Sequence, residues 1–303
     1  MPDMSVTLKT MRMKSPIVLA SGILGVTGDL LINVANAGAG AVTTKTIFLE
    51  QRDGNGSPVV AEYAHGLLNC IGLPCPGIEE SVKEIRLAKA AGIPLIASVG
   101  GKNTEEFIKV AQCCEEAGAD ALELNFSCPH AEAGLGANIQ YNRELAKSVV
   151  EAVKKNTTVP IIIKLTAEFK ISEIAKIVEA AGADMITCSN SVGPGMLIDV
   201  HTGKPVLSNK EGGVSGPAIK PIALRAVYQI AKNTTLPIIG TGGIHTGKDA
   251  LEFIMAGATA VGVGTSIMHH DLAAFKKIHS EMHEHLEEKG HKKLEEIRGL
   301  ALR

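Results

Sequence analysis

The sequence contains no tryptophan, and aromatic residues make up only 3% of its 303 residues. Valine, isoleucine, leucine and alanine must therefore fill the interior, and hydrophobic residues, at 45% of the chain, are numerous enough for a large core. Apolar runs of the roughly 20 residues that a bilayer requires are also missing, as is a secretory pattern at the start of the sequence. We therefore expect a cytoplasmic protein.

Strong charge bias and cysteine motifs are missing as well. The formal net charge is −2 and no cluster of lysine or arginine stands out, so we do not expect nucleic acid or an anionic membrane surface as a partner. The six cysteines include no Cys-x-x-Cys pair and no Cys/His set at metal-binding spacing. We therefore expect no metal site and a reducing compartment.

What the sequence does contain is a recurring unit, in which a helical pattern leads through Ala-Gly and a small residue into a short apolar strand. The unit appears at 37–44, 117–124, 181–188 and 256–263, and glycine suits the left-handed turn that ends each helix. Continuous apolar runs are typical of parallel strands buried on both faces. Together with the further runs between these units, the expected strands are 16–21, 41–44, 94–99, 121–124, 160–165, 185–188, 237–240 and 260–263.

Eight such strands separated by helical patterns predict a closed (β/α)8 TIM barrel, formed as a single domain over residues 1–303. A doubly wound open sheet is the alternative, but the glycine-rich loop after its first strand is missing. Residues 4–14 are expected to form a hairpin that covers the barrel floor, and residues 272–300 to form one or two amphipathic helices. The expected barrel helices are 78–90, 104–116, 144–155, 171–180, 219–231 and 248–255.

Polar residues and glycines follow the ends of most of these strands. In barrels of this kind the chemistry is located where the strands end, so we expect these residues to gather at one mouth. They are Lys45, Ser98, Asn125, Cys128, Lys164, Asn190, Ser191, Gly242, Gly243, Gly264 and Thr265.

Cys128 stands just past strand 121–124, within Asn-Phe-Ser-Cys-Pro-His at 125–130. A thiol in such a place can act as a catalytic acid/base or as a nucleophile. A buried structural cysteine is the alternative, but Pro129 and the polar flanking residues favour chemistry.

Two glycine motifs follow the last two strands, Gly-Thr-Gly-Gly at 240–243 and Gly-Val-Gly-Thr at 262–265. Barrels commonly hold a phosphate group after strands seven and eight, where glycine lets backbone N–H groups approach an anion closely. The sequence therefore predicts a phosphate site there, and 212–216 adds a third expected glycine loop after strand six.

Lys164 lies within the otherwise apolar run 161–165. A lysine is rarely buried without a partner. An electron-rich cofactor is one possible partner, and an ion pair with Glu123 or Asp184 is the alternative. Lys45, after strand two, carries the same ambiguity.

Taken together, the motifs resemble the dihydroorotate dehydrogenase family. The cysteine at 128 is similar to the class 1 enzymes, because membrane-bound class 2 relatives carry serine there and an additional N-terminal helix. The amino-acid sequence at 69–73 and 212–221 looks most like class 1B, the type that pairs with an iron–sulfur/FAD subunit and uses NAD. The motifs that carry the resemblance are Ala-Ser-Gly at 20–22, Thr-Lys-Thr at 44–46, Leu-Asn-Cys-Ile-Gly-Leu at 68–73, Asn-Phe-Ser-Cys-Pro at 125–129, Ser-Asn-Ser at 189–191, Gly-Val-Ser-Gly-Pro-Ala-Ile-Lys-Pro at 213–221 and Gly-Thr-Gly-Gly at 240–243.

The resemblance implies an FMN enzyme that oxidises dihydroorotate, with Cys128 as the base that takes the C5 proton and Lys45 beside it in the catalytic site. It implies that loop 126–141 closes over the substrate, with Gly134 and Gly136 as hinges, and that the chain forms a homodimer or a heterotetramer with the electron-transfer subunit. The implied cofactor contacts are Ser21, Lys45, Thr46, Ser98, Asn125, Lys164, Ser189, Gly216, Gly242, Gly243, Gly264 and Thr265. The implied substrate contacts are Lys45, Asn69, Ile71, Gly72, Leu73, Asn125, Asn190 and Ser191.

Two residues depart from the class 1 pattern, which has asparagine where this chain has His130 and usually asparagine in the segment that here contains Cys75. By resemblance, both lie near the substrate's carboxylate. Cys-Pro-His is similar instead to the pyrimidine domain of dihydropyrimidine dehydrogenases, so oxidation of a dihydrouracil is the closest alternative. A non-redox barrel that binds a phosphorylated metabolite is the alternative from another class.

Overall fold

Eight parallel strands close into a barrel in the computed structural model, which describes residues 1–127 and 137–303. This confirms the predicted TIM barrel and excludes an open doubly wound sheet. Neighbouring strands pair in the order β10-β15-β16-β3-β4-β7-β8-β9. Their bounds are β3 (Ile17–Leu19), β4 (Ala41–Thr43), β7 (Leu95–Val99), β8 (Ala121–Asn125), β9 (Ile161–Leu165), β10 (Met185–Cys188), β15 (Ile238–Thr241) and β16 (Ala260–Val263).

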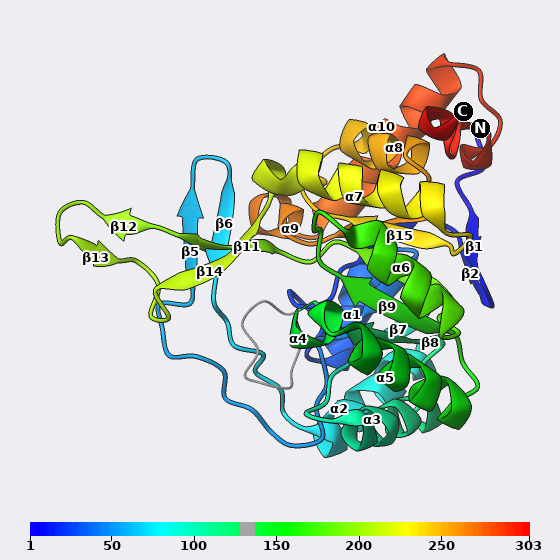
Figure 1. Ribbon diagram of the computed structural model, residues 1–303. Helices are drawn as coiled ribbons and strands as arrows, with labels where there is room; N and C mark the ends of the chain where they lie inside the picture. The colour runs from blue at the N-terminus through cyan, green and yellow to red at the C-terminus, as the bar shows by residue number, and fades with distance from the viewer. Residues whose placement is uncertain (128–136) are drawn as a thin grey trace.

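Helices surround the barrel (Figure 1), and each predicted helix is present within two residues of its predicted ends. The helix after β3 was not predicted, although Thr27 caps its first turn by accepting a hydrogen bond from the Leu30 N–H. The expected C-terminal helices are confirmed as α10 and two short 3₁₀ turns. The helical elements are α1 (Gly28–Asn36), α2 (Ile78–Ala90), α3 (Thr104–Glu116), α4 (Ala137–Tyr141), α5 (Arg143–Asn156), α6 (Ile171–Ala180), η1 (Pro217–Ile219), α7 (Lys220–Asn233), α8 (Gly247–Met255), α9 (Ser266–His270), α10 (Ala273–Glu288), η2 (Leu294–Ile297) and η3 (Leu300–Leu302).

An N-terminal hairpin of β1 (Val6–Leu8) and β2 (Met11–Met13) closes the bottom of the barrel, as predicted. Its apolar side chains form one buried cluster with one inward-facing residue from each barrel strand. Burial of this apolar area stabilises the floor and fills this end of the barrel with side chains. The cluster consists of Leu8, Met11, Met13, Val18, Ala41, Ile96, Ala121, Ile162, Met185, Ile239 and Ala260.

A second sheet projects from the barrel beyond the ends of its strands (Figure 1). It has the order β11-β14-β6-β5, and the short β12–β13 hairpin extends from it. This sheet was not predicted from the sequence, and the loop expected at 212–216 is wrong, because most of that segment is strand β14. Glycine is required within that strand, because a Cβ at Gly212 would lie 2.6 Å from the Asn69 carbonyl oxygen. The strands are β5 (Val60–Tyr63), β6 (Gly66–Asn69), β11 (Val192–Met196), β12 (Ile198–Asp199), β13 (Lys204–Pro205) and β14 (Glu211–Ser215).

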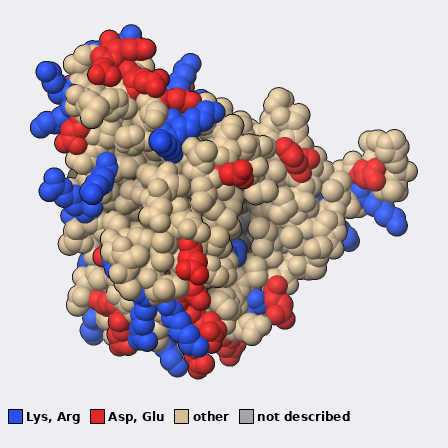
Figure 2. Space-filling model, turned by 180° about the vertical axis from the view of Figure 1, so that it is seen from behind, with Lys and Arg blue, Asp and Glu red and all other residues tan. Residues whose placement is uncertain are grey.

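Charged side chains of both signs are intermingled over the face shown in Figure 2, and no wide area of one sign is visible there. The projecting sheet stands out from the body of the molecule in the same view.

Candidate active site

A cavity of about 380 Å³ lies at the C-terminal ends of the barrel strands, where the projecting sheet adds one wall. Apart from Ser98, every predicted contact of the cofactor and the substrate lines this cavity. Cys128, His130, Gly134 and Gly136 lie outside the described residues. The predicted contacts that line it are Ser21, Lys45, Thr46, Asn69, Ile71, Gly72, Leu73, Asn125, Lys164, Ser189, Asn190, Ser191, Gly216, Gly242, Gly243, Gly264 and Thr265.

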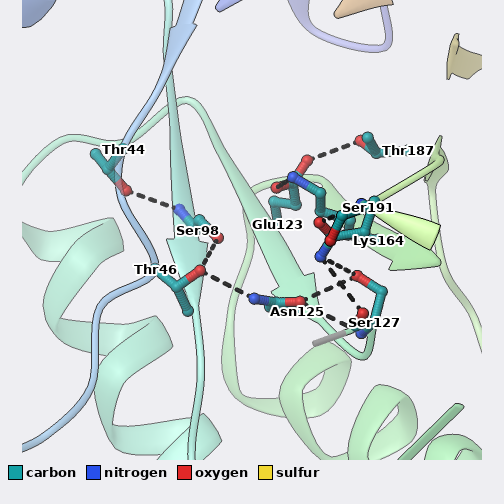
Figure 3. A network of polar contacts seen from close by, with 10 residues as sticks. Thr44, Thr46, Ser98, Glu123, Asn125, Ser127, Lys164, Thr187 and Ser191 are labelled. Atoms are coloured by element: carbon teal, nitrogen blue, oxygen red, sulfur yellow. Dashed lines mark hydrogen bonds and ion pairs between the residues drawn. The ribbon is translucent and has the colours of Figure 1, made fainter. Parts of the chain in front are cut away.

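Ser98 lies one layer behind the cavity wall and is fully buried. Its Oγ is 3.1 Å from Thr46 Oγ1, and Thr46 Oγ1 also accepts a hydrogen bond of 3.0 Å from Asn125 Nδ2 (Figure 3). Sequence position alone places Ser98 at a strand end, but it faces this network instead of the cavity.

Asn125 continues the network toward the rim of the cavity. Its Oδ1 accepts hydrogen bonds from the Ser127 N–H at 3.3 Å and from the Ser127 hydroxyl at 3.1 Å. Asn190 Nδ2 donates to Ser127 Oγ at 2.9 Å. Both amides are therefore held in fixed orientations, and so is the residue that directly precedes Cys128.

Lys164 is 4% exposed and is held within the barrel by an ion pair. Its Nζ lies 3.4 Å from Glu123 Oε1, and Glu123 Oε2 accepts a hydrogen bond of 2.8 Å from Thr187 Oγ1 (Figure 3). Asp184, the other partner considered for Lys164, instead pairs with Lys154 at 2.6 Å. The structure therefore contains the ion pair between Lys164 and Glu123, and Lys164 also lines the cavity.

The glycine motifs form one corner of the cavity. Gly216, Gly242 and Gly243 have φ angles of +87°, +133° and +73°, which glycine adopts most easily. In the described part of the chain, the backbone N–H groups of Gly242, Gly243 and Gly264 donate to no acceptor. Unpaired N–H groups at a concave surface are suited to bind an anion, so the corner fits a phosphate group.

Asn69 and the turn that follows it form the wall contributed by the projecting sheet. Asn69 Nδ2 donates to the Gly213 carbonyl oxygen at 3.2 Å, which ties β6 to β14. Gly72 and Leu73 have φ angles of +82° and +57°, so the chain turns sharply here, and both residues line the cavity.

Cys75, one of the two departures from the class 1 pattern, lies in the core. It is 4% exposed, and its Sγ accepts hydrogen bonds from the backbone N–H groups of Phe48 and Gly77, both at 3.3 Å. It is not among the residues that line the cavity. Cys75 therefore packs in the core and anchors a turn, and its side chain is not exposed to the cavity in which the substrate is expected.

Three polar residues at the cavity were not singled out from the sequence: Ser215, Thr241 and His245. Thr241 Oγ1 is buried and has no hydrogen-bond partner among the described residues, so a ligand can satisfy it. Burial lowers the pKa of His245, and the neighbouring His269 lowers it further. Thr241 could have been predicted from the sequence, because it lies within the Gly-Thr-Gly-Gly motif at 240–243.

Neither a membrane span nor a metal centre is found in the parts of the chain that the structure describes. No helix there is long and apolar enough to cross a membrane. The same residues include no group of three or more His, Cys, Asp or Glu side chains placed to hold a metal ion.

Comparison with known proteins gives a consistent picture. A family model described as dihydroorotate dehydrogenase matches residues 3–286. The chain is 45% identical to a protein of Methanothermobacter thermautotrophicus over 96% of this chain and 95% of the relative. It is 43% identical to one of Pyrococcus abyssi over 99% of both, and 40% identical to one of Thermoplasma acidophilum over the full length of both. All three relatives are named dihydroorotate dehydrogenase B (NAD(+)), catalytic subunit.

Proposed function

Because the chain belongs to the dihydroorotate dehydrogenase family, we propose that it oxidises dihydroorotate to orotate in pyrimidine biosynthesis, with FMN as its cofactor, in the cytoplasm. One observation supports this most: a glycine corner suited to a phosphate, a buried lysine and a set of oriented amides all face the same cavity. A flavin mononucleotide and a pyrimidine need these three kinds of group.

The residues present fit FMN. Its phosphate would bind the unpaired N–H groups of Gly242, Gly243 and Gly264, and Thr241 Oγ1 offers an unsatisfied hydroxyl beside them. Bound FMN would supply the acceptor for the hydride that leaves C6 of dihydroorotate. The ring and ribityl chain would contact Ser21, Thr46, Asn125, Lys164 and Ser189, with Ser98 acting through Thr46.

Lys164 would stabilise negative charge in the cavity. It is the cation of a buried ion pair, and its side chain faces the space in which the flavin would lie. Electrostatic effects are stronger in such a dry site than in water, so the ammonium would favour the reduced, negatively charged flavin over the oxidised one.

The substrate would lie against the amide side chains of Asn69, Asn125 and Asn190. A pyrimidine presents C=O and N–H groups in alternation, and an amide offers both a donor and an acceptor. The backbone at Ile71, Gly72 and Leu73 and the side chains of Lys45 and Ser191 would complete the substrate contacts. Lys45 would also contact the flavin.

Cys128 would accept the proton from C5 while the hydride leaves C6, so that dihydroorotate loses two electrons and two hydrogens. The thiolate is the active base, and a free thiol has a pKa of about 8.5. Ser127, which precedes Cys128 in the sequence, is anchored by its hydrogen bonds to Asn125.

The electrons would leave through a partner. The relatives are named as catalytic subunits that use NAD, and we propose that this chain forms a homodimer or a heterotetramer with an FAD/iron–sulfur subunit that passes the electrons to NAD.

Turnover of two substrates by the purified protein tests this function. We expect a yellow protein with the absorbance of flavin, which oxidises dihydroorotate much faster than dihydrouracil when one dye serves as the electron acceptor in both assays. Faster turnover of dihydrouracil would assign the dihydropyrimidine reaction instead. A colourless protein that gains no activity when FMN is added would contradict the redox function altogether.

A further inference from the structure

Glu123 is a buried carboxylate for which the proposed substrate and cofactor contacts give no role. It is 2% exposed and is absent from the residues that line the cavity. It lies on β8, in register with Ser98 on β7 and two residues before Asn125. It is thus one layer deeper in the barrel than the groups that would touch a ligand.

Three neighbouring strands bring their side chains together at this point. Lys164 on β9 is in register with Thr187 on β10 and with Asn125 on β8. Glu123 receives the hydroxyl hydrogen of Thr187 on one oxygen and faces the ammonium of Lys164 with the other. Figure 3 shows the three side chains converging.

The second carboxylate oxygen has only one partner among the described residues. Glu123 Oε1 accepts no hydrogen bond from the described residues, and its contact with Lys164 is the 3.4 Å ion pair. A buried carboxylate is costly unless a charge or a donor compensates it. Packing alone would be served as well by a neutral side chain, so the carboxylate points to an electrostatic role.

We infer that Glu123, anchored by Thr187, is a positioning residue that fixes the Lys164 ammonium at the base of the cavity and offsets part of its charge. This inference rests on the proposed function, because the group that senses the charge is the flavin. Lys164 favours the reduced flavin, and Glu123 limits that preference. The pair thus sets how tightly reduced FMN binds relative to oxidised FMN.

The quantity to measure is the ratio of the dissociation constants of oxidised and reduced FMN. Titration with oxidised FMN gives the first constant, and the reduction potential of the bound flavin gives the ratio. Glu123→Gln keeps the size of the side chain and removes its charge. We expect it to favour reduced FMN by on the order of tenfold relative to the wild type. An unchanged ratio, or a shift toward oxidised FMN, would overturn the inference and leave the proposed function intact.

A second pair of variants keeps the test decisive if Glu123→Gln does not fold. Thr187→Val removes the hydroxyl that stabilises the carboxylate, so we expect a smaller shift in the same direction. Thr187→Ser retains the hydroxyl and should match the wild type. Equal ratios in the valine and serine variants would contradict the anchoring role. A wild-type protein that binds no FMN would remove the proposed function and this inference together.

Discussion

Asn125 at the end of β8 donates a hydrogen bond of 3.0 Å to Thr46 after β4, and the bond passes over β7, the strand between them. Ser98 on β7 supports the same hydroxyl from behind at 3.1 Å. Three neighbouring strands are thereby joined at the mouth of the barrel. The side-chain oxygen of Asn125, Oδ1, accepts the hydrogen bond that orients Ser127. The amide is therefore oriented before any ligand binds.

The Thr46 hydroxyl should matter for cofactor binding. Thr46→Val removes the acceptor of the Asn125 amide and one partner of Ser98, and a hydrogen bond is worth about 1 kcal/mol. We expect oxidised FMN to bind roughly fivefold more weakly, as measured by quenching of flavin fluorescence. Thr46→Ser keeps the hydroxyl and should bind like the wild type. Equal affinity in the valine variant would show that the network does not preorganise the site.

A substitution in the glycine corner should weaken FMN binding without changing the stability of the apo-protein. A Cβ at Gly264 has only the Ala20 Cβ, at 3.7 Å, within 4 Å, so Gly264→Ala should leave the melting temperature of the apo-protein unchanged. The added methyl group would crowd the proposed phosphate, and we expect FMN affinity to fall by on the order of tenfold. Gly56→Ala, with nothing within 4 Å of its Cβ, is the control away from the cavity. Unchanged affinity in Gly264→Ala would place the phosphate elsewhere.

Gly243 should respond differently, because its backbone requires glycine. Its φ is +73°, and a Cβ there would lie 2.8 Å from the Lys220 Cβ and 2.9 Å from the Gly216 carbonyl oxygen. Gly243→Ala should therefore lower both the melting temperature of the apo-protein and the FMN affinity. Thermal unfolding with and without FMN measures both effects, and a variant as stable as the wild type would contradict the geometry of the corner.

The buried ion pair predicts a non-additive effect on stability. Lys164→Met leaves Glu123 buried without its cation, which should destabilise the apo-protein by about 3–5 kcal/mol. Adding Glu123→Gln should recover much of that loss, because the uncompensated charge is gone. Lys154→Met breaks the more exposed pair with Asp184 and should cost about 1 kcal/mol or less. Denaturant unfolding is measured for the wild type, Lys164→Met, Glu123→Gln, the double variant and Lys154→Met. Additive losses in the double variant would show that Lys164 and Glu123 are not coupled.

His245 should make the folded apo-protein sensitive to acid. Its pKa lies below the ordinary value of 6.5, first because it is partly buried and then because His269 is adjacent. Below pH 6.5 the unfolded chain takes up a proton at this residue that the folded protein resists. The stability is therefore complete above pH 6.5 and falls as the pH drops toward the folded-state pKa.

The check is the melting temperature of the apo-protein between pH 5 and 8. His245→Gln should flatten the decline, and the remainder would come partly from His279, whose pKa burial also lowers. His201→Gln, on the exposed turn between β12 and β13, is the matched control. An identical decline in the His245 variant and the wild type would exclude this residue as the source.

The barrel could be predicted from the sequence because each of its strands is a short apolar run between helical patterns. The projecting sheet could not, because Gly212 and Gly213 lie in a strand that glycine normally weakens. The close approach of Asn69 and Leu207 to Gly212, which favours glycine there, is visible only in the structure. The residues at the mouth were predicted by the rule that catalytic groups follow the ends of the strands. That rule fails at Ser98, which is buried and does not line the cavity. Which carboxylate pairs with Lys164 depends on strand register, which the sequence does not reveal.

The assignment of Cys128 as the base predicts a loss of rate without a loss of cofactor. Cys128→Ala should bind FMN normally but slow its reduction by dihydroorotate roughly 10²- to 10⁴-fold at neutral pH. Cys113→Ala, in helix α3 and away from the cavity, should behave like the wild type. Rapid-mixing absorbance measures both rates, and undiminished reduction in Cys128→Ala would remove the base assignment.

Anaerobic reduction of the flavin in the wild-type protein tests whether dihydroorotate is the substrate. The FMN-loaded protein is mixed without oxygen with dihydroorotate or, separately, with dihydrouracil, and the visible absorbance is followed over a single turnover. We expect rapid bleaching by dihydroorotate, with orotate formed in equal amount, and little bleaching by dihydrouracil on the same timescale. A flavin that stays oxidised with dihydroorotate, or that dihydrouracil bleaches faster, would contradict this expectation.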